Sequence, residues 1–160
     1  MIRKLRRKFI CSAMLAILLV LGVIVGTIHI VNYHRIAENA DALLSILAEN
    51  GGKFPKLSNP PPDGWKGDGG RKISPETPFE LRYFTVELDQ DGNVIATDTG
   101  NIAAIGEESA IEFAQEVYSS GNEHGFLKFY RYLRQDTQDG CVLLFVDCTR
   151  ELSNFQGFLT

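Results

Sequence analysis

Residues 9–28 read FICSAMLAILLVLGVIVGTI and contain no charged side chain. At 1.5 Å per residue, a helix of this length is roughly 30 Å long, which matches the hydrocarbon core of a bilayer. The segment therefore predicts a transmembrane helix over residues 9–31. The alternative is a cleaved signal peptide, which has a shorter apolar core and ends at an A-x-A-like site. The C-terminal end of the apolar segment, Thr27-Ile28-His29, contains no such cleavage site, so an uncleaved anchor is favoured.

Basic side chains are concentrated ahead of this segment, whereas only Arg35 closely follows it. Loops rich in Lys and Arg stay on the cytoplasmic side of a membrane. The sequence thus predicts a cytoplasmic basic segment at residues 1–8, an anchor in the plasma (cell) membrane, and residues 32–160 as the extracytoplasmic part. The basic residues of the first segment are Arg3, Lys4, Arg6, Arg7 and Lys8.

The formal charge of the chain, −4, combines two very different regions. Without the five N-terminal basic residues, 11 basic and 20 acidic residues remain, which is a charge of −9. A surface of this sign repels phosphate backbones, so we expect the lipid bilayer as a partner and no nucleic acid. With 160 residues, the chain has room for one anchor and one small folded domain.

The region after the anchor has the pattern of a helix followed by a loop. Between residues 32 and 50, apolar side chains recur at the spacing of one helical stripe, and Gly51-Gly52 is a typical helix stop. We therefore predict a juxtamembrane helix at 32–50. All six prolines and many glycines follow, which predicts a loop at 51–78. The residues of the stripe are Ile36, Ala40, Leu43, Leu44 and Leu47.

Residues 79–148 have the pattern of two hairpins around a helix. Runs of β-branched and aromatic residues at 79–88 and 94–97 flank Asp89-Gln90-Asp91-Gly92-Asn93, a strong hairpin signal. The same DxDG could begin a calcium loop, but the remaining acidic ligands are missing, which favours a turn. A second hairpin is predicted from strands at 125–134 and 141–148 around Asp139-Gly140.

Two further helices complete the predicted domain. Residues 107–120 place Ala110, Ile111, Ala114, Val117 and Tyr118 on one helical face. A last helix is expected at 149–160, leading toward a second transmembrane span beyond this chain. Helices and antiparallel strands in this order predict an α+β fold: a small antiparallel sheet with packed helices over residues 79–148.

One predicted strand carries the candidate ligand-binding residues. In the run from Phe126 to Arg134, alternation places Lys128, Tyr130, Tyr132 and Arg134 on one face. Arginines bind carboxylates and tyrosines form pocket walls, so this face suits an anionic small molecule. The alternative is a solvated sheet face with long amphipathic side chains. The candidate ligand-binding residues are Arg82, Tyr83, Tyr130, Arg131, Tyr132 and Arg134.

Other motifs favour plain structural roles. None of the three histidines has partners at the spacing of a zinc site, and no nucleophile–base pair can be assembled, so we expect no metal site and no catalytic residue in this chain. Cys141 and Cys148 are roughly 23 Å apart along one strand, too far for a disulfide. Gly22 and Gly26 have the GxxxG spacing of helices that dimerise in membranes, although glycine is also common there by chance.

Several segments resemble the N-terminal input region of bacterial transmembrane sensor histidine kinases of two-component systems. They are the basic start and apolar span, Ile30 to Arg35, Leu81 to Val86, and Leu143 to Arg150. The resemblance implies a homodimer with a PAS-like extracytoplasmic sensor domain between two membrane helices. It also implies a cytoplasmic kinase core that binds ATP and phosphorylates a response regulator.

The chain departs from that family because a second span, a dimerisation helix with a phosphoacceptor histidine and an ATP-binding domain are missing. His34 lies at the expected outer surface and lacks the sequence surroundings of a phosphoacceptor. ATP is therefore expected only for the missing kinase core. Two hypotheses follow: this chain is a fragment, the signal-input module of a sensor whose kinase core is not present in it, or it is a complete single-span protein whose outer domain binds an extracellular partner. An exported enzyme is a distant third.

Overall fold

The structure is a computed structural model that describes residues 2–54 and 80–156. Most of the loop predicted at 51–78, the first residue of the strand predicted at 79–88 and the end of the helix predicted at 149–160 lie outside the described residues. The chain divides into two units, Met1–Arg35 and Ile36–Thr160, and each is described by itself. The elements are α1 (Ile2–Glu49), β1 (Tyr83–Asp89), β2 (Val94–Asp98), α3 (Glu107–Ser120), β3 (His124–Leu127), β4 (Tyr130–Thr137), β5 (Gly140–Asp147) and α4 (Thr149–Gln156).

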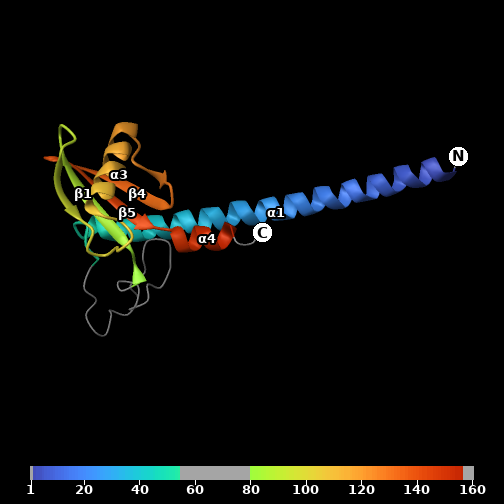
Figure 1. The fold of residues 1–160 in the computed structure, drawn as a ribbon, viewed down its shortest axis with the longest axis horizontal. Helices are drawn as coiled ribbons and strands as arrows, with labels where there is room; N and C mark the ends of the chain where they lie inside the picture. The colour runs from blue at the N-terminus through green and yellow to red at the C-terminus, as the bar shows by residue number, and fades with distance from the viewer. Residues whose placement is uncertain (1, 55–79, 157–160) are drawn as a thin grey trace. The chain divides into compact units, whose positions relative to one another are not determined.

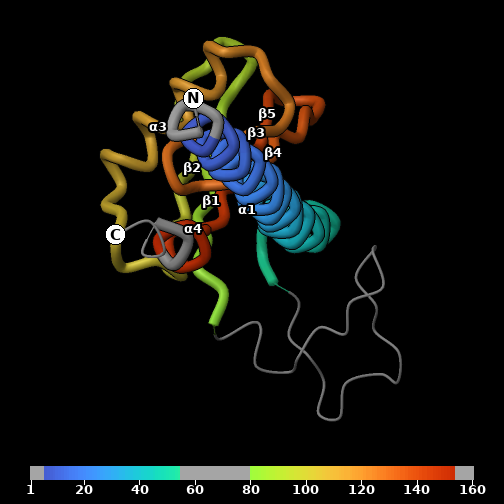
Figure 2. Tube along the Cα trace, turned by 90° about the vertical axis from the view of Figure 1, so that its right-hand side faces the viewer, coloured from blue at the N-terminus to red at the C-terminus, as the bar shows by residue number. Residues whose placement is uncertain are grey.

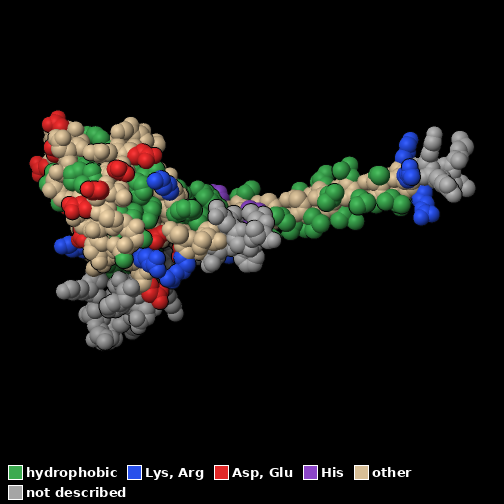
Figure 3. Space-filling model, in the orientation of Figure 1, with side chains coloured by type: hydrophobic (Ala, Val, Ile, Leu, Met, Phe, Trp, Pro, Cys, Tyr) green, Lys and Arg blue, Asp and Glu red, His purple; other side chains and the backbone are tan. Residues whose placement is uncertain are grey.

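The first unit is the N-terminal part of α1. Its apolar side chains from Phe9 to Val31 are exposed, and Figure 3 shows hydrophobic groups around the helix. By length and composition this helix can cross a membrane. Such a helix suits a lipid environment, because its side chains are apolar and its backbone hydrogen bonds are made within the helix.

The second unit contains a five-stranded antiparallel sheet in the order β2-β1-β5-β4-β3 (Figure 1). The predicted α+β class and antiparallel sheet are confirmed. In β5, the central strand, successive side chains point to opposite faces, and both faces are buried. Phe145 lies opposite Phe84 of β1 and Tyr132 of β4, and the Phe84 and Phe145 rings stack with centroids 4.5 Å apart.

Each face of the sheet has its own hydrophobic core. On one face, α3 packs Ala110, Phe113, Ala114 and Val117 against the sheet. On the other, residues 36–49 of α1 pack together with Leu152 of α4, and Figures 1 and 2 show this part of α1 on the side of the sheet opposite α3. The stripe predicted for α1 is confirmed, since its residues are buried or partly buried in this second cluster. Its members are Ile36, Ala40, Leu43, Leu44 and Leu47.

Several helix ends and one hairpin turn that were predicted from short sequence motifs are confirmed. The helix α3 spans the predicted residues 107–120 and ends at Gly121 in the left-handed conformation. The predicted stop after α1 is also confirmed, because the Gly52 N–H donates to the Leu47 carbonyl at 2.8 Å. In the predicted first hairpin, the Asp89 carboxylate accepts the N–H groups of Asp91 and Asn93. A further bond from the Asn93 side chain lowers the pKa of Asp89.

The single strand predicted at 125–134 is wrong. The chain reverses at Lys128 and Phe129, so this run forms parts of two paired strands, β3 and β4. Lys128 has φ 55°, a left-handed conformation that usually calls for Gly, Asn or Asp in a two-residue turn. Because neither turn residue is Gly, Asn or Asp, and because apolar and aromatic residues alternate through the run, the sequence pattern indicated one continuous strand. Lys128 is therefore not on the strand face assigned to it.

Gly140 provides a test of the packing at the start of β5. It has φ 153°, and a Cβ there would overlap the Leu88 carbonyl oxygen of β1. We expect Gly140→Ala to lower the free energy of unfolding by about 2–4 kcal/mol, because the central strand must shift. Gly106→Ala is the matched control: with φ −84° and open space around a Cβ, it should cost about 1 kcal/mol or less. Thermal unfolding of the full chain in detergent micelles, followed by circular dichroism, compares the two; equal losses would contradict this packing.

Candidate functional site

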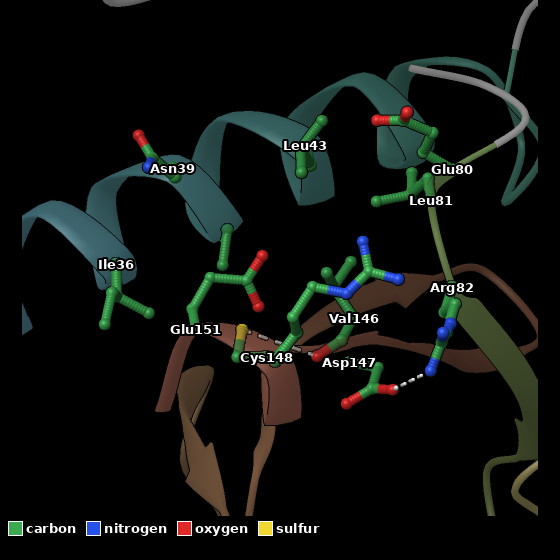
Figure 4. A pocket seen from close by; sticks show the side chains of 12 residues that line it. Ile36, Asn39, Leu43, Glu80, Leu81, Arg82, Val146, Asp147, Cys148 and Glu151 are labelled. Atoms are coloured by element: carbon green, nitrogen blue, oxygen red, sulfur yellow. Dashed lines mark hydrogen bonds and ion pairs between the residues drawn. The ribbon is translucent and has the colours of Figure 1, made fainter. Parts of the chain in front are cut away.

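A cavity of about 110 Å³ lies within the second unit, between α1, the approach to β1 and the junction of β5 with α4 (Figure 4). One water needs about 10–15 Å³ by a comparable measure, so the cavity has room for several waters or a small molecule. Its walls are apolar and its rim is charged. The lining residues are Ile36, Asn39, Ala40, Leu43, Glu80, Leu81, Arg82, Val146, Asp147, Cys148, Arg150 and Glu151.

Asp147 fixes the geometry of this junction. Its Oδ1 accepts the backbone N–H of Thr149 at 2.8 Å, which holds the first turn of α4. Its Oδ2 lies 3.7 Å from Nη1 of Arg82, and its own N–H donates to the Arg82 carbonyl at 2.9 Å. The Asp147 side chain is only 5% exposed, so these partners compensate the burial of its charge. The segment before β1 and the start of α4 are thereby tied together.

Cys148 contributes a buried sulfur to the cavity wall. Its thiol lies 3.8 Å from the Val146 carbonyl, to which it can donate. Burial raises the pKa of Cys148 to about 11. The thiolate is the reactive form of cysteine, so this sulfur serves as an apolar wall group and not as a nucleophile. All three cysteines are free, and the two in the sheet unit belong to opposite cores, Cys141 with α3 and Cys148 with α1.

Three of the six predicted ligand-binding residues lie on the α1 side of the sheet. Arg82 is at the rim of the cavity, half-exposed. Tyr83 is buried in the second core, and its hydroxyl accepts the N–H of Phe54 at 3.3 Å. Arg131 binds Asp41 of α1 through two hydrogen bonds, of 2.7 and 2.8 Å, and its guanidinium lies over the ring of Phe126.

The other three predicted residues belong to the opposite face. Tyr130 and Tyr132 do share a face with each other, but α3 covers it, and both rings are buried in the core that contains Phe84. Arg134 pairs with Asp136 at 2.8 Å and lies over the ring of Tyr118. The structure thus divides the predicted set between two faces, and only Arg82 reaches the cavity.

The remaining predicted sites are not connected with the cavity. Gly22 and Gly26 lie in the first unit with no side chain within 4 Å, and their role in dimerisation stays a prediction. Within residues 2–54 and 80–156, no group of three His, Cys, Asp or Glu side chains is placed to hold a metal ion.

Most of the cavity residues were not predicted as a site from the sequence. Ile36, Ala40 and Leu43 were recognised only as a core stripe. Asp147, the last residue of a buried strand, and Glu151, which follows it closely, could have drawn attention as charged residues, although nothing local places them opposite α1. No family model, curated protein or solved structure matches the chain.

The thiol of Cys148 reports on whether the cavity wall is closed. With a pKa of about 11, roughly 0.1% of the thiol is ionised at pH 8, so iodoacetamide should alkylate it about 100-fold more slowly than in the guanidinium-unfolded chain. Peptide mass spectrometry separates Cys148 from Cys141. Equal rates in folded and unfolded protein would contradict a buried sulfur.

The same pKa shift makes stability depend on pH in the alkaline range. Because the folded protein holds the proton more tightly than the unfolded chain, whose thiol has a pKa near 9.0, the contribution is complete below pH 9. We expect it to be lost as the pH rises from 9 toward 11. A Cys148→Ala chain, measured alongside by circular dichroism, should show a smaller loss over this range.

Proposed function

We propose that this chain is the signal-input module of a transmembrane sensor histidine kinase of a two-component system. In this proposal residues 1–8 are cytoplasmic, residues 9–31 span the plasma membrane and residues 32–160 form the extracytoplasmic sensor. The kinase core, which binds ATP and phosphorylates a response regulator, belongs to a continuation of the polypeptide. The apolar helix and the basic residues before it support this arrangement.

The sheet supports a PAS-like domain as the sensor. The resemblance to PAS-like sensors implies a small antiparallel sheet with packed helices. The five-stranded antiparallel sheet, with α3 on one face and residues 36–49 of α1 on the other, agrees with that expectation. In this proposal, residues 36–49 of α1 connect the sensor sheet to the membrane-spanning segment.

The observation that carries the proposal is the position of the cavity. It is lined by Asn39 and Leu43 of α1 and by Arg150 and Glu151 of α4, the first and last described helices of the sensor unit. A molecule in the cavity touches both helices at once. Binding that prefers one arrangement of the two helices shifts the population toward it. A displacement of α1 residues 36–49 is passed along the same helix toward residues 9–31.

In the membrane, we propose a parallel homodimer in which Gly22 and Gly26 allow close approach of two spans. The open space around both glycines agrees with this role.

A substitution that fills the cavity tests the proposal. Ala40 is 3% exposed and lines the cavity, so Ala40→Phe places an aromatic ring where a stimulus would bind. We expect it to change the autophosphorylation rate of the full polypeptide in lipid nanodiscs by about threefold or more, since it holds α1 and α4 in one arrangement. Ala103→Phe is the matched control, because Ala103 is exposed between β2 and α3.

Two outcomes would overturn this proposal. One is a reading frame that stops after Thr160 without a second apolar run and an ATP-binding region; the single-span binding protein would then be the better hypothesis. The other is an autophosphorylation rate that Ala40→Phe leaves unchanged, with circular dichroism showing that the variant is folded.

A further inference from the structure

Asp41 of α1 is held to the sheet by an arginine of β4. Two nitrogens of Arg131 donate to its carboxylate, Nε at 2.7 Å and Nη2 at 2.8 Å. Bidentate pairs of this kind are strong and fix the orientation of both side chains. The guanidinium carbon also lies 4.8 Å from the ring centroid of Phe126 on β3. Asp41 and Arg131 together form a clasp between α1 and β4.

The two members of the clasp differ in their exposure to water. The side chain of Arg131 is 12% exposed, whereas that of Asp41 is 45% exposed. Water can therefore reach the carboxylate, but the guanidinium has little access to water while α1 stays in place. Loss of the bond leaves a mostly buried cation without its carboxylate, which is costly. The cost falls when residues 36–41 move away from β4 and admit water.

The apolar contacts of α1 distinguish a firmly packed part from a part that can move. Leu44 and Leu47, which follow the clasp, are 1% and 0% exposed and lie in the second core. Ile36 and Ala40, which precede it, belong to the same core but also line the cavity. A segment beside an open space loses fewer contacts on moving than one enclosed on every side. Residues 36–41 are thus the part of α1 that the clasp restrains.

Movement of this part changes the width of the cavity. Asp41 directly follows Ala40, so the clasp and the cavity lining lie within one helical turn. Figure 4 shows α1 along one side of the space and Cys148 on the other side. The backbone N–H of Arg131 interacts with the Cys148 sulfur, so Arg131 lies beside the wall opposite α1. The clasp therefore joins the two walls.

We infer that the clasp controls access to the cavity by holding residues 36–41 of α1 against the sheet. In the closed arrangement the pair is formed and Cys148 is covered. In the open arrangement residues 36–41 are lifted, with Leu44 and Leu47 still packed, and small solutes reach Cys148. As the regulation of the proposed sensor, this inference rests on the proposed function. A stimulus that needs more than about 110 Å³ binds the open arrangement and shifts the population toward it.

The rate at which iodoacetamide alkylates Cys148, in the full chain in phosphatidylcholine nanodiscs, tests the clasp. Asp41→Asn keeps the shape of the side chain and removes its charge. We expect Cys148 to react about tenfold faster in this variant, since charge-assisted hydrogen bonds are lost. Asp136→Asn is the matched control, because it weakens the Arg134–Asp136 pair, whose partners both lie on β4. It should leave the Cys148 rate within about twofold.

Low concentrations of urea separate local opening from a loss of overall stability. Lifting one segment exposes little surface, so the Cys148 rate in the Asp41→Asn chain should stay nearly constant up to about 1 M urea. Cys141 is buried in the opposite core, which contains α3, so its alkylation requires the sheet to unfold and should accelerate with urea. Peptide mass spectrometry follows both thiols in the same sample.

A chain with both Asp41→Asn and Arg131→Gln tests whether the two residues act as a pair. If they do, its Cys148 rate should equal that of the faster single variant and not the product of the two effects. Burial raises the pKa of Cys148, and the charge of Arg131 opposes this shift. Removal of that charge by itself slows alkylation, so any acceleration in the Arg131→Gln chain comes from access.

Three results would overturn the inference: an unchanged Cys148 rate in the Asp41→Asn chain, a rate that rises with urea in parallel with that of Cys141, or multiplied effects in the double variant. In each case the sensor function stands if Ala40→Phe still changes autophosphorylation. The opposite combination, faster alkylation with autophosphorylation unaffected by Ala40→Phe, rejects the sensor function and leaves the clasp as the control of access to the cavity.

Discussion

The structure depends on a central strand that is buried on both faces. In β5, Leu143 and Phe145 face α3, while Leu144 and Val146 face α1. Each such side chain contributes about 1.5–3 kcal/mol when removed from water, but only if both faces are covered. The sheet therefore requires a helix on either side. One of them is α3, and the other is formed by residues 36–49 of α1 with α4.

The described residues cover the second face incompletely, and the cavity lies where they leave a gap. The described part of α4 is eight residues long and contributes Leu152 to the core, so it covers only the end of the sheet where β5 stops. Between it and α1, the chain entering β1 brings charged residues, Glu80 and Arg82, to the surface. Asp147 then ties this segment to α4 through its carboxylate. A gap between three segments that are distant in sequence is well placed to couple a bound molecule to their relative positions.

The sequence allowed a good prediction wherever a local signal determines the structure. The helix at 107–120 could be located because Gly121 stops it, and the first hairpin because Asp-Gly forms its turn. The turn at Lys128 and Phe129 could not, since neither residue is a usual turn former. Tyr130 and Tyr132 were expected to line a pocket, because alternation defines a face without revealing that α3 covers it. The cavity itself joins residues from three distant segments, and no periodicity in one sequence indicates that they meet.

The dependence of the sheet on α1 is the central claim, and the cooperativity of unfolding of two shortened chains tests it most directly. One chain comprises residues 36–160 and the other residues 52–160, which lack the α1 stripe but keep the strands β1–β5 and α3. Our account predicts that the longer chain unfolds in one cooperative thermal transition, whereas the shorter one shows none, because Leu144 and Val146 are left uncovered. A cooperative transition of residues 52–160 at the same midpoint as the longer chain would contradict it.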